Sequence, residues 1–384
     1  YYLRGVADEE ADQFGVFANA PYFEGGEIQI IAEESSRVAA RQTGDVDHVT
    51  LPPDRGQEFI DADHSSVVLA DTPFNNSLSV NMRDTGWTAG PGNLFRVTEF
   101  RQALAASIDK QELIEGVYRG FHNEHHTWQP EFSEWYPGTD ELTLFGDPEN
   151  GVYGDDARDL AEQALEQVDE DYAYDGDTLL TPSGDPVELE LYYNASSNTQ
   201  ALAADIYNQS FQEHLGFSLN INSINATRYS EEYWSASDDI AEPGTTVEYQ
   251  GKEFTWDAPN PNNPGPREFT SNESWDFGTV FGLNTFPLNP QTNDAFFDGA
   301  GVFYNPVGYY PEFDAQSLFQ QAREAETREE LQEVFGEIFT NLNREQPYIM
   351  LTFGVDIEAY NPDLVGPIAD FANGWDSPAW HFEE

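Results

Sequence analysis

The one metal-like cluster in the sequence consists of His122, His125 and His126 with Glu124. His122 and His126 are four residues apart, with Glu124 between them. On a helix these residues would share a face, and imidazole nitrogens with a carboxylate oxygen suit zinc-type metals. However, Gly120 precedes the cluster and Pro130 follows it, which argues against a continuous helix. Histidines in a polar loop commonly make ordinary hydrogen bonds. We therefore expect no bound metal, and name His122, Glu124 and His126 as the residues to examine.

Catalytic motifs are missing from the sequence. It contains no Gly-x-Ser-x-Gly elbow, phosphate-binding glycine loop, His-Glu-x-x-His helix or dinucleotide fingerprint, and no cysteine. Asp175-Gly176-Asp177 lacks the remaining ligands of a calcium loop and is interpreted as a turn. With 71 acidic residues, chance pairs of carboxylates are unavoidable, so catalysis by paired acids stays an open alternative. We expect a protein that is not an enzyme and that has no cofactor.

Tryptophans in polar loops are better candidates for a binding site. Aromatic rings offer flat, rigid surfaces to peptides and sugars in ligand clefts. Trp128 and Trp256 lie in polar loops, where ligand contact and core packing are both open. Trp275 adjoins a predicted strand, which favours a place in the core.

The charge balance excludes some classes of partner. The 384-residue chain has 16 basic and 71 acidic residues, a net charge of −55. Nucleic acid binding requires a basic surface, so we expect no nucleic acid partner. The acids are spread through periodic, aromatic-rich segments, which argues against a disordered acidic tail. Concentrated salt would screen the repulsion, so adaptation to high salt explains the charge better than an acidic functional surface. No apolar run is long enough to span a membrane.

The pattern of apolar residues predicts an α/β protein with more than one core. Helices are expected near residues 35–43, 98–108, 110–119, 156–168, 199–215, 313–325 and 328–343. Gly44 is expected to end the first of these, and Thr98 and Asp109 are expected to cap the second and third. Strands are expected near residues 27–31, 66–70, 77–82, 187–193, 217–221 and 275–282. Residues 237–272 are rich in proline, asparagine and glycine, and no regular structure is expected there. A chain of this length exceeds one typical core, so two lobes are expected.

Two stretches carry a resemblance to a known family. The first contains Arg101, Gln102, Ala103, Leu104, Ala106, Ile108, Asp109 and Gly120. The second contains Asn19, Tyr22, Ser36, Arg37, Ala39, Ala40, Gly44, Val46 and Asp47. Their order and spacing resemble extracellular solute-binding protein family 5, in which the first stretch opens the large C-terminal lobe.

The resemblance implies a periplasmic-binding-protein-like α/β fold of type II, with two lobes joined by a hinge of crossing segments. Residues 1–92 and 359–384 are then expected to form part of lobe I, and residues 93–358 the large C-terminal lobe, lobe III. The small lobe II and the start of lobe I are expected to be absent from this chain. Together with the acidic composition, the resemblance points to a haloarchaeal-like member of the family.

The resemblance also implies a function. The chain is expected to be the substrate-binding component of an ABC importer, which captures an oligopeptide or similar small solute by hinge closure. It would deliver the solute to a membrane permease, outside the cell, as a lipoprotein whose anchor is not in this chain. An oligosaccharide ligand is an alternative within the family. A secreted carbohydrate-active enzyme and a cell-surface interaction protein are alternatives from other classes.

One departure from the family pattern bears on the ligand. Peptide-binding members carry an aspartate that pairs with the ligand's free amino group, and Thr285 stands about where that aspartate would be. A buried ammonium needs a charged partner, so this change weakens the expectation of peptide capture and favours hydroxyl or amide groups. The residues expected to bind the ligand are Asn81, Trp128, Trp256, Arg267, Asn284, Thr285 and Phe286.

Overall fold

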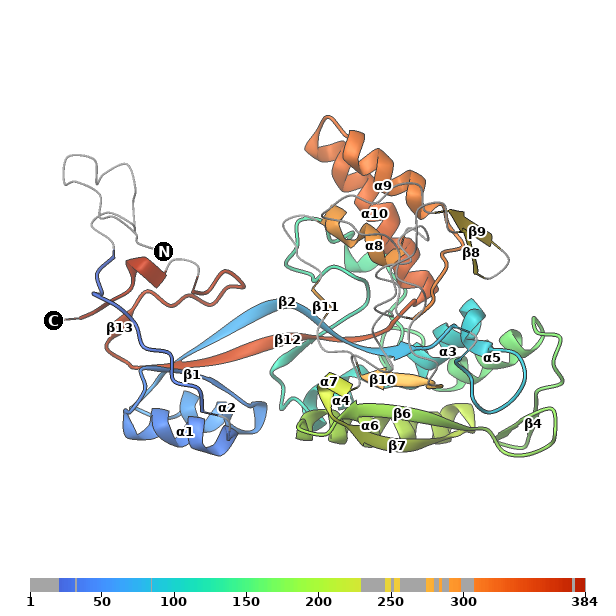
Figure 1. The fold of residues 1–384 in the computed structure, drawn as a ribbon, viewed down its shortest axis with the longest axis horizontal. Helices are drawn as coiled ribbons and strands as arrows, with labels where there is room; N and C mark the ends of the chain where they lie inside the picture. Colours follow the sequence, from blue (N-terminus) through green and yellow to red (C-terminus); the bar gives the residue numbers. More distant parts are fainter. Residues whose placement is uncertain are drawn as a thin grey trace. The chain divides into compact units, whose positions relative to one another are not determined.

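The computed structural model describes residues 21–31, 33–83, 85–228, 246–249, 252–255, 274–279, 283–284, 290–297, 307–374 and 377–383 (Figure 1). Helices and strands are mixed along the chain, as predicted. The chain divides into two compact units. Unit 1 comprises Tyr1–Thr72, Tyr118–Asn123 and Phe353–Glu384, and unit 2 comprises Pro73–Val117 and Glu124–Thr352. The division into lobes given above stays a prediction.

Unit 1 is built on β1 (His48–Leu51) and the end of β12 (Ile349–Tyr360), which pair antiparallel with His48 opposite Tyr360. Helices α1 (Glu34–Thr43) and α2 (Pro53–Ile60) lie beside this pair (Figure 1). The core of the unit contains Val38, Val49, Leu51, Phe59, Ile357 and Ala359. Gly44 ends α1 in the left-handed conformation, as the sequence predicted for a helix C-terminus.

Two expectations about strands in the N-terminal part were wrong. Residues 27–31 are extended but belong to no strand, and Ile28 and Ile30 are 93% and 96% exposed. An apolar run predicts a strand only where a neighbouring strand can pair with it. Residues 66–70 and 77–82 do not form two strands, since a single strand, β2 (Ser66–Val80), covers nearly all of both.

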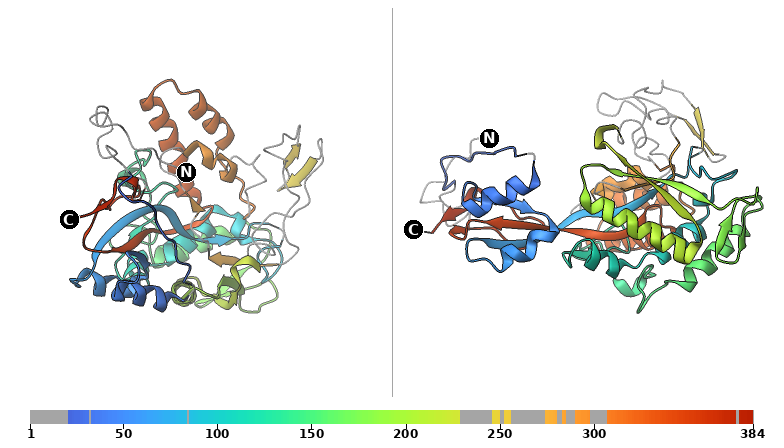
Figure 2. Two further views of the ribbon diagram at one scale, coloured as in Figure 1. Left: turned by 60° about the vertical axis from the view of Figure 1, so that its left-hand side comes forward. Right: turned by 90° about the horizontal axis from the view of Figure 1, so that it is seen from below.

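Unit 2 contains a β-α-β unit. Strands β6 (Glu188–Asn194) and β7 (Ser218–Ile224) are parallel, and the chain between them forms α6 (Asn198–Ser210) and a π-helical turn (Phe211–Leu215). Helix α6 lies across the β6–β7 pair (Figure 2). Parallel neighbours need such a crossover helix, which buries its apolar face on the sheet. Strand β10 (Phe277–Thr279) continues the sheet, parallel to β6 and antiparallel to β2.

Aromatic rings fill the core beside this sheet. Phe277 on β10 packs against Phe95 and Phe211, with ring centroids 5.0 and 5.4 Å apart. Trp87 packs edge-to-face on Phe95 and Phe100 at 5.1 and 5.3 Å. Such edge-to-face contacts add to the stabilisation from apolar burial. These contacts therefore pack β10 against the segment around Phe95 that precedes the first helix of unit 2.

The helices of unit 2 follow the sequence closely. Besides α6, the predicted helices are α3 (Thr98–Ser107), α4 (Lys110–Gly116), α5 (Asp155–Leu165), α9 (Ala315–Glu324) and α10 (Arg328–Glu345). Two short helices, α7 (Ala226–Arg228) and α8 (Asp294–Phe297), were not predicted. Asp109 caps α4 by accepting a hydrogen bond from the Glu112 amide, as predicted. The prediction of Thr98 as the cap of α3 was wrong, because the helix begins at Thr98 itself.

Short elements complete the unit. They include η3 (Leu94–Arg96), η4 (Thr139–Glu141) and η7 (Pro290–Asn293). Strand β3 (His122–Glu124) belongs to unit 1 up to Asn123 and to unit 2 at Glu124. Strands β4 (Ala173–Asp175) and β5 (Thr178–Leu180) form a hairpin around the predicted turn at Gly176. Strands β8 (Thr246–Tyr249) and β9 (Lys252–Thr255) also pair, so part of the stretch expected to lack regular structure is a hairpin. Within the described ranges, no helix has the length and apolar character needed to cross a membrane.

Helix α10 contains Gly336 at a position where neither the backbone conformation nor the surrounding atoms require a glycine. Gly336 has no left-handed φ, and no atom lies within 4 Å of the position that a Cβ would take. Glycine in a helix interior costs about 1 kcal/mol relative to alanine. We therefore expect Gly336→Ala to raise the free energy of unfolding by about 0.5–1 kcal/mol in urea titrations. An unchanged or lower value would mean that the helix needs this glycine.

Candidate functional site

The side chain of Asn81, an expected ligand residue, is fully buried just after β2. Its Oδ1 accepts hydrogen bonds from the backbone N and the Nε of Arg83, at 3.1 and 3.2 Å. Its Nδ2 donates to Thr85 Oγ1 at 3.2 Å and to the Trp275 carbonyl at 3.0 Å. All the usual hydrogen-bonding capacity of an asparagine amide is thus used by the protein.

A buried aspartate lies next to Asn81. The backbone N of Asn81 donates to the carbonyl of Asp276 at 3.0 Å. The Asp276 carboxylate accepts from the backbone N and Oγ1 of Thr88 at 2.7 and 2.6 Å, and from the Glu190 amide at 2.7 Å. Burial raises its pKa to about 6, against the lowering effect of these hydrogen bonds. A Cβ on Gly86 would come within 1.8 Å of the Asn81 carbonyl, so only glycine fits there.

The tryptophan expected to bind ligand is also buried. Trp128 is fully enclosed, packed edge-to-face on Phe297 at 4.6 Å and tilted against Tyr348 at 5.4 Å. Its contacts in this structure are those of a core residue. Trp275 is fully buried as well, which confirms its predicted place in the core.

The other expected ligand residues fall mainly outside the described part of the chain. Trp256, Arg267, Thr285 and Phe286 lie outside the described residues. Asn284 belongs to β11 (Leu283–Asn284), which pairs antiparallel with β2 so that Asn284 lies opposite Phe74. The assignment of ligand contacts to these residues stays a prediction.

Glu124 and His126 are joined by a hydrogen bond, as members of a chain of polar groups. His126 Nε2 lies 2.8 Å from Glu124 Oε2, and His126 Nδ1 lies 3.0 Å from Nζ of Lys110. The Lys110 ammonium also donates to the His125 carbonyl at 2.6 Å. In the part of the chain that the structure describes, no group of three or more ligand side chains could hold a metal ion. The His122 ring instead stacks on Tyr118 at 3.5 Å.

The protonation states in this chain follow from burial. Desolvation lowers the pKa of Lys110 to about 7 and that of His126 to about 4. The hydrogen bond from His126 is the largest cause lowering the pKa of Glu124. At neutral pH, His126 is therefore neutral, with Nε2–H donating to Glu124 and Nδ1 accepting from Lys110. A buried amine is thereby connected through an imidazole to a partly exposed carboxylate.

Sequence reasoning missed Lys110. The residue is at the first position of α4, where an exposed lysine is the ordinary expectation, yet it is 1% exposed. The one available signal was that the sequence holds only two lysines, Lys110 and Lys252.

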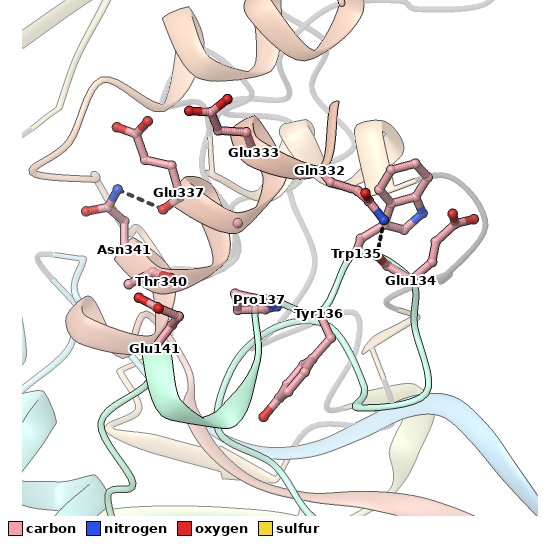
Figure 3. A pocket seen from close by; sticks show the side chains of 11 residues that line it. Glu134, Trp135, Tyr136, Pro137, Glu141, Gln332, Glu333, Glu337, Thr340 and Asn341 are labelled. Carbon is pink, nitrogen blue, oxygen red and sulfur yellow. Dashed lines mark hydrogen bonds between the residues drawn. The ribbon is translucent and has the colours of Figure 1, made fainter. Parts of the chain in front are cut away.

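A groove of about 700 Å³ runs along α10 in unit 2 (Figure 3). One side is formed by Trp135, Tyr136 and Pro137, and the other by residues of α10 from Gln332 to Asn341. Of the expected ligand residues, the described Asn81 and Trp128 are not among its lining residues. This groove could not be predicted from the sequence, because its two sides are about 200 residues apart along the chain.

Comparisons with known proteins show which family and fold the chain shares. Residues 10–261, more than half of its length, match the family model for bacterial extracellular solute-binding proteins, family 5 (middle). No match was found among curated protein sequences. Among solved structures, the ABC transporter substrate-binding protein CtaP from Listeria monocytogenes has a TM-score of 0.66 at 13% identity, covering 93% of this chain and 60% of its own.

Two further structures share the fold. NikZ from Campylobacter jejuni, in complex with Ni(L-His), has a TM-score of 0.63 at 16% identity, covering 92% of this chain and 61% of its own. The oligopeptide-binding protein AppA from Bacillus subtilis, in complex with a nonapeptide, has a TM-score of 0.63 at 15% identity, covering 92% and 60%. The chain thus spans about 60% of the length of these structures. Its fold is the periplasmic-binding-protein-like α/β fold that the sequence predicted, and the chain belongs to family 5 of the bacterial extracellular solute-binding proteins.

Proposed function

We propose that this chain is part of the substrate-binding component of an ABC importer, and that it captures an oligopeptide or a similar small solute outside the cell. The match of residues 10–261 to the family model carries the proposal. The ligands named for AppA and NikZ, a nonapeptide and a nickel–histidine complex, indicate the range of solutes to test. Delivery to a membrane permease and lipid anchoring belong to the same proposal.

Hinge closure around the solute is supported by how two strands are divided. β2 contributes residues up to Thr72 to unit 1 and from Pro73 to unit 2, and β12 changes unit between Thr352 and Phe353. Few crossing segments are the usual basis of hinge motion in two-lobed binding proteins. The chain also changes unit between Val117 and Tyr118 and between Asn123 and Glu124. We propose the two points within β2 and β12 as hinge positions.

The ligand contacts are proposed at Asn284, Thr285 and Phe286, with Trp256 and Arg267. Asn81 and Trp128 belong to the same proposal, and their buried contacts suit a supporting role. Asn81 lies just after β2 and bonds the Trp275 carbonyl there. The same strand, β2, pairs with β11, which contains Asn284. A neutral asparagine and threonine suit amide or hydroxyl groups of a solute.

Thermal unfolding of the full chain in molar salt tests this function. A ligand at 100 times its dissociation constant stabilises the folded state by about 2.7 kcal/mol. We expect members of a peptide panel to raise the midpoint of unfolding by several degrees and to be recovered unchanged. Thr285→Ala should reduce this ligand-induced shift without altering the midpoint of the free protein. The control Thr227→Ala, at an exposed position, should leave the ligand-induced shift unchanged.

Other outcomes distinguish the alternatives. A shift with oligosaccharides only would favour a sugar ligand for the same protein. Release of products from a glycan would contradict the binding function and favour an enzyme. No shift with any peptide, sugar or nickel complex would also contradict it.

A further inference from the structure

The groove along α10 has the dimensions of a site for a short extended segment. Its floor is the row Gln332, Gly336 and Thr340, one helical turn apart on α10. Glu333 and Glu337 form the adjacent row (Figure 3). From Gln332 to Thr340 the floor is about 12 Å long, given the rise of an α-helix. Three or four extended residues span the same length.

Gly336 lies in the middle of this floor, where the folded chain itself needs no glycine. The position is helical and the space above its Cα is open. A glycine there leaves the helix backbone bare between Gln332 and Thr340. This allows another chain to approach α10 closely, facing the wall of Trp135, Tyr136 and Pro137.

The rim of the groove is acidic. Glu333, Glu337 and Glu141 are exposed, and the ion pairs found among the described residues include none of the three. Glu134, at the end of the groove, pairs with Arg328. Glu333 and Glu337 are one helical turn apart, a separation of about 6 Å. Side chains two residues apart on an extended segment are about 6.6–6.8 Å apart on one face.

We propose that this groove binds an extended segment of a partner protein with the pattern basic-x-basic, whose two cationic side chains pair with Glu333 and Glu337. The segment backbone would pass over Gly336, and its apolar stems would contact the half-buried Tyr136 and Pro137. The described residues Asn81 and Trp128 do not line this groove, and the inference does not depend on the nature of the solute.

Other occupants fit less well. A small molecule prefers an enclosed, mostly apolar pocket, whereas this groove is open and rimmed by carboxylates. A second copy of this chain would bring a net charge of −55 to an acidic surface, and like charges suppress such pairing. Among the described residues, no carboxylate and histidine cluster here could hold a metal ion.

Fluorescence anisotropy with a labelled acetyl-Arg-Val-Arg-amide peptide tests the proposal on the full chain. We expect saturable binding at one site. The matched peptide with citrulline in place of arginine, which has the same shape without the charge, should bind at least tenfold more weakly. Absence of saturable binding by the arginine peptide would overturn the proposal.

Variants separate this groove from diffuse attraction to an acidic protein. Gly336→Leu keeps the charge and fills the floor, and Glu333→Gln with Glu337→Gln removes the paired charges; each should weaken binding at least tenfold. The control Glu112→Gln with Glu115→Gln removes the same charge from exposed positions of α4 and should change binding less than twofold. Equal effects of the two double variants, or wild-type binding by Gly336→Leu, would overturn the proposal. The charge variants alter exposed side chains only, so they remain informative if Gly336→Leu does not fold.

Discussion

Replacing Arg101 by methionine is expected to lower the free energy of unfolding by about 3–5 kcal/mol. Arg101 is a fully enclosed guanidinium in α3, and it joins three segments of unit 2. Removing one member of a buried polar network leaves its partners buried without hydrogen bonds, which costs several kcal/mol. Methionine keeps the approximate volume and the helix propensity, so the loss would report on the polar contacts.

The contacts of Arg101 explain the size of this effect. Its Nε donates to the Glu345 carbonyl at 2.8 Å, one terminal nitrogen to the Phe95 carbonyl at 2.8 Å, and the other to Thr98 Oγ1 at 2.9 Å. The Glu345 carboxylate in turn accepts from the Tyr309 hydroxyl at 2.6 Å. Burial lowers the pKa of Arg101, although the nearby Tyr309 and Glu345 oppose this. The planar guanidinium thus bonds the start of α3 to the end of α10.

Urea unfolding at constant high salt measures the effect. Arg101→Lys keeps the charge but lacks the planar guanidinium, so we expect it to lower the free energy of unfolding by less than Arg101→Met does. Arg328→Met is the matched control, because that side chain is 65% exposed and pairs with the partly exposed Glu134 outside this network, and it should cost less than about 1 kcal/mol. A loss below 1 kcal/mol for Arg101→Met would contradict this account of the network.

The helices could be predicted because their signals are local. The capping residue Thr327, with Glu330 three positions later, begins α10 where the apolar period predicted it, and Asp109 begins α4. Strands depend on partners far along the chain. Residues 27–31 have the apolar content of a strand, yet they lie exposed and unpaired in this part of the structure. The family resemblance then gave the fold, because order and spacing of short motifs survive where identity is low.

The candidate site was less predictable, since it depends on burial. Asn81 was expected to contact ligand, but its amide is used by Arg83, Thr85 and Trp275. Trp128 lies in a polar stretch of sequence, although Phe297 and Tyr348 enclose it. Neither set of contacts can be read from the sequence, because the partners are up to about 220 residues away. Lys110 has nearby partners, His125 and His126, and was missed because its burial cannot be read from the sequence.

Replacing Lys110 by methionine is expected to change how stability depends on pH. The pKa of Lys110 is about 7 in the folded protein, against 10.5 for an unperturbed lysine. Between these values the unfolded chain holds a proton that the folded chain has released. The free energy of unfolding of the wild type should therefore rise with pH, by about 1.4 kcal/mol per pH unit from this residue. Lys110→Met should lack this rise.

The measurement is the difference in unfolding free energy between wild type and Lys110→Met, from urea titrations between pH 7 and 10.5. Groups common to both proteins cancel in the difference, which isolates the buried amine. Arg323→Met removes a partly exposed cation that stays charged throughout this range, so its difference from wild type should be constant with pH. A constant difference for Lys110→Met would contradict the assignment. A rising difference would mean that the charged form of Lys110 lowers the free energy of unfolding below pH 7. Among the described residues, the His125 carbonyl, the His126 ring and the nearby acids Glu124 and Asp147 then stabilise the buried ammonium.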